Sequence, residues 1–179
     1  MLSAATNLSP EDIDQKIVQA KIDPAQVDRA HILAAIKAVE SADGKLLNHV
    51  FIDDGPHQGE RAIGPYAFLP STMQELISKS PRLKQKYSKI LTLPFGNQEQ
   101  SQIEAFVSKH PQIHDDLANE YVDQIMKRTS AKTAGQISQA WLYGIKGYNR
   151  QVKQKVDMNS PRFTKAQATF DKSKQGGSI

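Results

Sequence analysis

The sequence of 179 residues contains no cysteine, which excludes disulfide bonds, thiol nucleophiles and thiolate metal ligands. It also lacks a run of about 18 apolar residues, the length that a membrane-spanning helix requires, so we expect no membrane insertion. The first residues, Met1 to Asn7, do not combine a basic stretch with an apolar one, so no secretory signal is expected. If the protein acts outside a cytoplasm, we expect another system to carry it there.

Charge of one sign is not concentrated anywhere. The 23 basic and 19 acidic residues are well mixed and give a formal net charge of +4. A basic helical protein that binds nucleic acid is one alternative, and residues 79–89 are the nearest approach to the basic cluster that it would need. The mixed charges argue against it, so we expect no nucleic-acid partner.

The five histidines show no spacing typical of a zinc site. His110 and His114 lie four residues apart, but Pro111 begins a predicted helix between them and no third ligand is near. A phosphate-binding loop with the pattern Gly-x-x-x-x-Gly-Lys is also missing. We therefore expect neither a metal nor a cofactor.

Helix starts are clear because capping residues stand directly before proline. Ser80-Pro81 and Ser160-Pro161 are examples, and Asp23-Pro24 adds Gln26 as the third helical residue. These signals and the apolar spacing predict a mainly α fold. The helices are expected over 10–21, 24–41, 70–79, 81–90, 98–109, 111–128, 133–143, 147–155 and 161–170.

The helix expected over 111–128 should be the buried centre of the fold. Apolar side chains recur every four residues along one broad face, at Ile113, Leu117, Tyr121 and Ile125. A helix that reads DNA would instead expose basic and amide side chains.

The segment 46–67 differs from the rest of the chain. It is β-prone at Leu47 to Asp53 and continues into Asp54-Gly55-Pro56, a turn signal. It therefore predicts a small, irregular β-hairpin between helices.

Glu40 is the leading candidate for acid catalysis. It lies four residues after Ile36, at the edge of the apolar face of the helix expected over 24–41, and in the last turn before Gly44. Partial burial disfavours a charged carboxylate, and so does the negative end of a helix dipole. Both effects favour the protonated form that a general acid in glycoside cleavage needs.

Three short motifs strengthen this interpretation because of their order. They are Val39-Glu40-Ser41, then AIGPYAFLPST from Ala62 to Thr72, then QAWLYG from Gln139 to Gly144. Together they resemble the lysozyme-like superfamily, which includes soluble lytic transglycosylases, goose-type lysozymes and phage muramidases. The resemblance extends over about residues 29–150.

The resemblance implies a lysozyme-like helical domain over 24–157, with a small β-hairpin beside the catalytic cleft. An N-terminal helical extension over 1–23 would precede it, and a C-terminal helix and flexible tail over 158–179 would follow. Glu40 would be the general acid/base. The substrate-binding residues implied are Ser41, Gly64, Tyr66, Phe68, Trp141 and Tyr143.

Two aspects of the implied cleft stay open. One of Tyr66 and Phe68 should point into the cleft and the other into the core, and we favour Tyr66 for the cleft; Trp141 fits either place. The chain also departs from the family pattern at Ala67 and Leu142, where the family has a cleft glutamine and a cleft asparagine. Both changes remove a hydrogen-bonding side chain.

Most glycosidases use two carboxylates. Asp53, Asp54 and Glu60 are the possible second carboxylate, but Asp53 and Asp54 look like turn residues and Glu60 lies in a glycine-rich stretch. A lytic transglycosylase needs no second carboxylate, because the C6 hydroxyl of muramic acid serves as the acceptor. We therefore favour cyclisation to a 1,6-anhydro product over hydrolysis.

The sequence thus predicts a peptidoglycan-cleaving glycosidase, a lytic transglycosylase or muramidase that acts on the MurNAc-GlcNAc β-1,4 bond. The alternative is a catalytically weak, lysozyme-like module that binds glycan or has a structural role in a phage particle or secretion machine. The substitutions at Ala67 and Leu142 favour that alternative. The partners that the resemblance implies are peptidoglycan glycan strands, together with other virion or secretion-machine proteins. It also implies a protein that is virion-associated, or delivered to the periplasm or cell wall by another system.

Overall fold

A computed structural model describes residues 24–41, 49–154 and 160–175, and helices dominate this part of the chain. No β-strand occurs within it. The expectation of a mainly α fold is confirmed. The helices are α2 (Pro24–Glu40), η1 (Gly55–His57), α3 (Pro70–Lys79), α4 (Pro81–Tyr87), η2 (Ser88–Thr92), α5 (Ser101–Lys109), α6 (Ile113–Arg128), α7 (Ala134–Lys153) and α8 (Pro161–Lys174), of which η1 and η2 are 3-10 helices.

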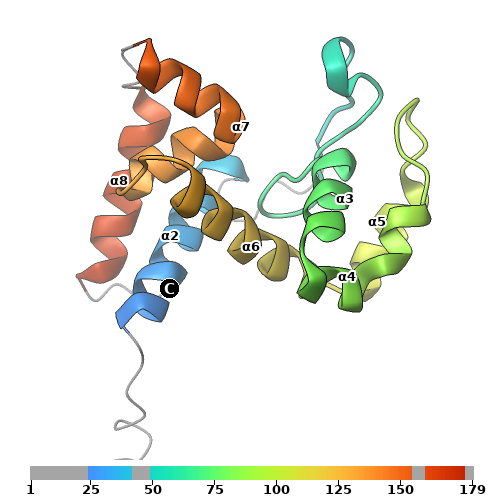
Figure 1. The fold of residues 1–179 in the computed structure, drawn as a ribbon, viewed down its shortest axis with the longest axis horizontal. Coiled ribbons are helices and arrows are strands. Elements are labelled where there is room, and N and C mark those ends of the chain that lie inside the picture. Colours follow the sequence, from blue (N-terminus) through green and yellow to red (C-terminus); the bar gives the residue numbers. More distant parts are fainter. Residues whose placement is uncertain (1–23, 42–48, 155–159, 176–179) are drawn as a thin grey trace, which may run out of the picture.

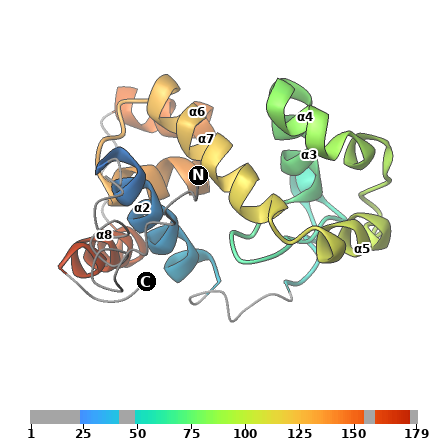
Figure 2. The same cartoon turned by 90° about the horizontal axis from the view of Figure 1, so that it is seen from below.

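The helices form two lobes that α6 joins (Figure 1, Figure 2). In the first lobe, α2, α7 and α8 pack against one another. In the second lobe, α3 packs against α4 and η2, and α5 lies beside them. Helix α6 contacts α2 and α7 of the first lobe and α3 and α4 of the second, so it holds the two lobes in one body.

The apolar face of α6 lies in the core. Its fully buried side chains are Ile113, Leu117, Ala118, Val122 and Ile125. Burying each of the larger aliphatic side chains contributes about 1.5–3 kcal/mol to the free energy of folding. The prediction that residues 111–128 form the buried centre is therefore confirmed.

Helix boundaries follow the capping signals closely. Proline occupies the first turn of α3, α4 and α8, where its missing N–H is no loss. The Ser80 hydroxyl accepts a bond from the Leu83 backbone N–H at the start of α4. Helix α5 begins at Ser101, three residues later than expected, because Asn97 and Gln98 adopt positive φ angles that a helix cannot include.

Helix α7 is two helical segments joined at a kink. Thr133 and Gln136 form a reciprocal capping box at its start. Gly144 has a φ of 69° and a ψ of 161°, which interrupts the helix. The sequence predicted separate helices over 133–143 and 147–155, and the kink at Gly144 falls between them.

The predicted β-hairpin is wrong for residues 49–67, the described part of its segment. The chain there forms η1 and loops instead. Its backbone bonds do not build a ladder. Ile52 N donates to Glu60 O at 2.8 Å, which closes the loop around η1, and Gly59 O accepts from Gln98 N at 2.9 Å. The Gln100 side chain bonds both the N–H and the carbonyl of Arg61, at 2.9 and 3.0 Å. A side-chain amide and a neighbouring loop thus take the hydrogen bonds that a partner strand would use.

Helix α8 belongs to the first lobe, where it packs on α2 and α7 and buries Phe163 and Ala166. Lys165 Nζ donates to the carbonyl of Ala38 at 2.9 Å. The predicted helix over 10–21 and the predicted domain boundaries at 23 and 157 lie outside the described residues, as does the end of the predicted tail.

Candidate functional site

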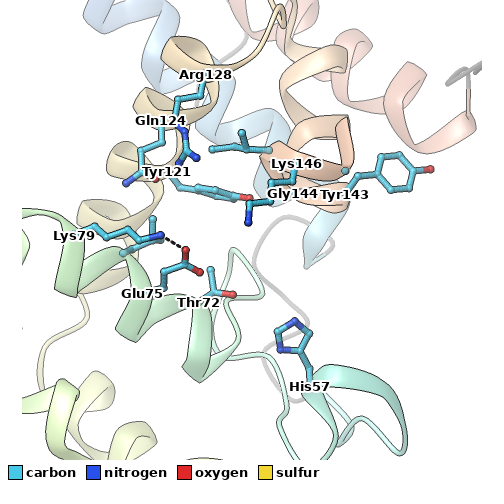
Figure 3. Close-up of a pocket in the computed structure, with 13 residues that line it drawn as sticks. His57, Thr72, Glu75, Lys79, Tyr121, Gln124, Arg128, Tyr143, Gly144 and Lys146 are labelled. Carbon is cyan, nitrogen blue, oxygen red and sulfur yellow. Dashed lines mark hydrogen bonds and ion pairs between the residues drawn. The ribbon is translucent and has the colours of Figure 1, made fainter. Parts of the chain in front are cut away.

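A groove runs between the two lobes and over α6. It consists of two adjoining cavities of about 390 and 350 Å³. We call these the acidic end, because Glu40 lines it, and the basic end, because Arg128 and Lys146 line it. The residues that line both cavities are His57, Thr72, Tyr121, Tyr143 and Gly144. Figure 3 shows the basic end, with Tyr121, Gln124 and Arg128 following one another along α6.

Glu40 is the last residue of α2, and its side chain is only 9% exposed. Its Oε1 lies 2.5 Å from Nη2 of Arg162, at the start of α8. The two groups form an ion pair but are not aligned as a hydrogen bond. The acidic end therefore holds a carboxylate that already has a counter-ion.

Three aromatic rings border the acidic end. Phe68 and Trp141 are core residues, 3% and 9% exposed, and Tyr121 is partly buried. Trp141 lies 5.1 Å from Phe68 and 4.9 Å from Tyr121, measured between ring centroids. Such tilted ring pairs are a favourable packing geometry. Burial, followed by the nearby charge of Glu75, raises the pKa of Tyr121 to about 12, so its hydroxyl stays protonated at neutral pH.

The expected orientations of Tyr66 and Phe68 are reversed. Tyr66 is 1% exposed and donates from its hydroxyl to Asp115 Oδ1 at 2.7 Å. Phe68 is also buried, at 3% exposed, but it is the one of the two that borders the groove. The reason lies in the backbone at Ala67, which has a φ of 52° and closes a turn with Gly64. The antiparallel bridge between Ile63 and Phe68 then directs the Phe68 ring toward Trp141.

Three other predicted binding residues have structural contacts instead. Ser41 is fully buried, and its hydroxyl donates to Pro65 O at 2.6 Å. This bond links the end of α2 to the turn over residues 64–67. Gly64 lies in another cavity, against His114. Tyr143 lines the groove with its backbone end, but its ring extends away from the cavity (Figure 3) and packs against Phe163, with the centroids 6.1 Å apart.

The possible second carboxylates do not line the groove. Asp53 and Asp54 are exposed on the loop around η1, and Asp53 borders a separate cavity with Gln98. Glu60 is buried beneath the loop, where it contacts His57 and the start of α3. The interpretation of Asp53 and Asp54 as loop residues agrees with these positions.

Ala67 and Leu142 both line the acidic end of the groove. They present apolar side chains at the two positions where the resemblance implies hydrogen-bonding groups. The groove instead gains polar groups from residues that sequence reasoning missed: His57, Thr72 and Tyr121. Tyr121 was assigned to the core because of its helical spacing, and no local pattern pointed to His57 or Arg162.

Within the described residues, no group of three or more histidine, aspartate or glutamate side chains is placed to hold a metal ion. No helix of this part of the chain has the length and apolar character needed to cross a membrane. Comparisons with protein-family models, with curated proteins and with solved structures found no match to this chain.

Proposed function

We propose that the groove is the active site of a peptidoglycan-cleaving glycosidase, a lytic transglycosylase or muramidase of lysozyme-like fold, and that Glu40 is its general acid/base. The observation that carries the proposal is a mostly buried carboxylate in the wall of a groove that is also lined by Phe68 and Trp141. Aromatic rings stack on the C–H faces of sugars, and a carboxylic acid beside them can protonate a glycosidic oxygen.

The reaction is cleavage of the β-1,4 bond that follows N-acetylmuramic acid. Glu40 donates its proton to the leaving oxygen of that bond while the anomeric carbon becomes oxocarbenium-like. In the free protein Glu40 is held in an ion pair with Arg162. Substrate entry would therefore have to loosen the contact with Arg162 before the proton can be transferred.

The partner in this proposal is a glycan strand of the cell wall. Delivery as part of a virion or through a secretion machine would bring the protein to that strand. Proteins of those assemblies would be its other partners.

A first prediction tests Glu40. The Glu40→Gln variant should lose cell-wall lysis by at least about 100-fold, because the amide keeps the size of the side chain but cannot donate the proton. The assay is clearing of purified peptidoglycan in a gel, followed by mass spectrometry of the released fragments.

Glu99→Gln is the matched control, because Glu99 is exposed and outside the groove. It should clear peptidoglycan at the parent rate. Equal clearing by the Glu40 variant and the parent would show that Glu40 is not the general acid/base.

The alternative function is a glycan-binding module with little or no catalysis. Two observations favour it: Arg162 neutralises Glu40, and the side chains of Ala67 and Leu142 offer no hydrogen bonds to a sugar. Such a module would sediment with insoluble peptidoglycan and release no soluble fragments. The gel and mass spectrometry experiment therefore separates the two functions.

A further inference from the structure

Glu60 is held at both of its carboxylate oxygens. Its side chain is 5% exposed. Oε2 accepts a hydrogen bond from the backbone N–H of Ser71 at 2.8 Å, in the first turn of α3, where the helix dipole favours negative charge. Oε1 lies 3.1 Å from Nδ1 of His57. A buried carboxylate with these partners has a fixed position and points at the imidazole.

The position of Glu60 decides which nitrogen of His57 carries the proton. A carboxylate accepts hydrogen bonds, so in the neutral form of the imidazole Nδ1 is the donor and Nε2 has the lone pair. The hydroxyl of Ser71 lies 3.3 Å from the same Nδ1. The side-chain contacts of His57 with Glu60 and Ser71 are both made through Nδ1.

The His57 side chain is 45% exposed and lines both cavities of the groove. Figure 3 shows the imidazole at the end of the cavity opposite Arg128, beside Thr72. Glu40 and His57 therefore line the same acidic end but come from different segments of the chain. An imidazole oriented by a carboxylate, with its second nitrogen accessible, is the arrangement of a general base.

We infer that His57, oriented by Glu60, is the base that activates a water molecule, so that the glycosidic bond is hydrolysed and not cyclised. This inference rests on the proposed function. The expectation of cyclisation depended on the lack of a second base, and His57 and Glu60 together supply one. Glu60 is then a positioning residue, and His57 is a catalytic residue that touches the attacking water.

The step balances in atoms and protons. The water oxygen forms a bond to the anomeric carbon as the bond from that carbon to the leaving oxygen breaks. Glu40 gives its proton to the leaving oxygen, and Nε2 of His57 takes a proton from the water. The negative charge of Glu60 stabilises the resulting imidazolium. Transfer of that proton through solvent back to Glu40 restores the starting state.

Cleavage of purified peptidoglycan in water labelled with heavy oxygen tests the inference. The parent protein should release fragments with reducing muramic acid ends that carry the label. Anhydro ends, lighter by one water and free of label, would overturn the inference while leaving the proposed glycosidase in place. Release of no fragments at all would contradict both the inference and the proposed glycosidase function.

Variants of the pair provide a second readout. His57→Ala should lower kcat by about 100-fold or more with little change in KM, and added imidazole should restore part of the rate. Rescue by a small base distinguishes catalysis from a role in folding. Glu60→Gln should lower kcat less, because the amide still bonds Ser71 N but no longer stabilises the imidazolium.

His110→Gln is the control, since His110 lies outside the groove and packs on Phe106. It should retain the parent rate. If the alanine variant does not fold, His57→Gln, which keeps the bulk of the side chain, is measured in its place. Parent-level hydrolysis by a folded His57 variant would overturn the inference.

Discussion

A carboxylate with little solvent contact needs a partner for its charge, and Arg162 supplies it for Glu40. Arg162→Gln should therefore lower the free energy of unfolding by about 1–3 kcal/mol, the usual cost of a buried polar group left without its partner. In the Glu40→Gln background the same substitution should cost less, because no charge is left unpaired. Urea unfolding of the four proteins measures the coupling. Equal costs in both backgrounds would show that the ion pair contributes nothing.

Gly64 is a residue where conformation and space both exclude a side chain. Its φ is +74°, and a Cβ there would lie 2.0 Å from the ring of His114. Gly55 has a similar φ of +79° but open space around it. Gly55→Ala should cost about 1–2 kcal/mol for the left-handed backbone alone. Gly64→Ala should cost about 1–3 kcal/mol more, because it also overpacks the site.

Thermal and denaturant unfolding of the two glycine variants check this difference. Because the turn after Gly64 carries Ala67 and Phe68, Gly64→Ala should also weaken glycan binding. A Gly64 variant as stable as the Gly55 variant would mean that His114 moves aside without cost.

Single residues also show where sequence reasoning stops. Glu40 could be placed at the end of its helix from local spacing alone, and the structure puts it there. The orientation of Tyr66 and Phe68 could not be predicted from local spacing. It depends on the positive φ of Ala67, a conformation that a non-glycine residue seldom adopts.

Helices were the elements best predicted, because proline, capping residues and apolar spacing are local signals. The loop from Val50 to Arg61 was mispredicted for a physical reason. Its hydrogen-bond partners, Gln98 and Gln100, lie almost forty residues further along the chain, and β-propensity does not report such partners. The boundary between α4 and η2 was missed as well, since apolar spacing does not distinguish the last turn of an α-helix from a 3-10 helix.

Asp116 of α6 links that helix to α4. Tyr87 donates to its Oδ2 at 2.7 Å, and Lys86 and Arg82 lie 3.0 Å from its two oxygens. Burial alone would raise the pKa of Asp116, but the bonds from Tyr87, Lys86 and Arg82 outweigh it and lower the pKa below the ordinary value. The bonds between Glu104 of α5 and Arg61 likewise lower the pKa of Glu104, against an opposing effect of burial.

The lowered pKa values of Asp116 and Glu104 predict that the protein loses stability in acid. A carboxyl group whose pKa is lower in the folded state stabilises the protein fully above its unfolded value of about 4, and this contribution is lost as the pH falls through the folded value. Asp116→Asn should lower stability at neutral pH and flatten the pH dependence below about pH 4. Urea unfolding at several pH values measures the slope. Asp53→Asn, on an exposed loop, should leave the slope unchanged.

At the scale of the whole molecule, the groove depends on contacts between distant segments. Arg162 reaches Glu40 from the far end of the chain, and Glu60 positions His57 only because α3 begins beside it. The three motifs of the sequence do meet around one groove, through Glu40, Phe68 and Trp141. Their neighbours there could not be predicted, since packing between lobes leaves no periodic signal in the sequence.

Helix α6 gives the groove a direction. Tyr121, Gln124 and Arg128 line it from successive turns of one helix face, which are about 5.4 Å apart along the axis. A linear polymer lying along that helix meets an aromatic ring, then an amide, then a cation, in an order that the helix fixes. The two ends of the groove therefore differ in chemistry, and a polymer with a head and a tail meets these three groups in opposite orders in its two directions.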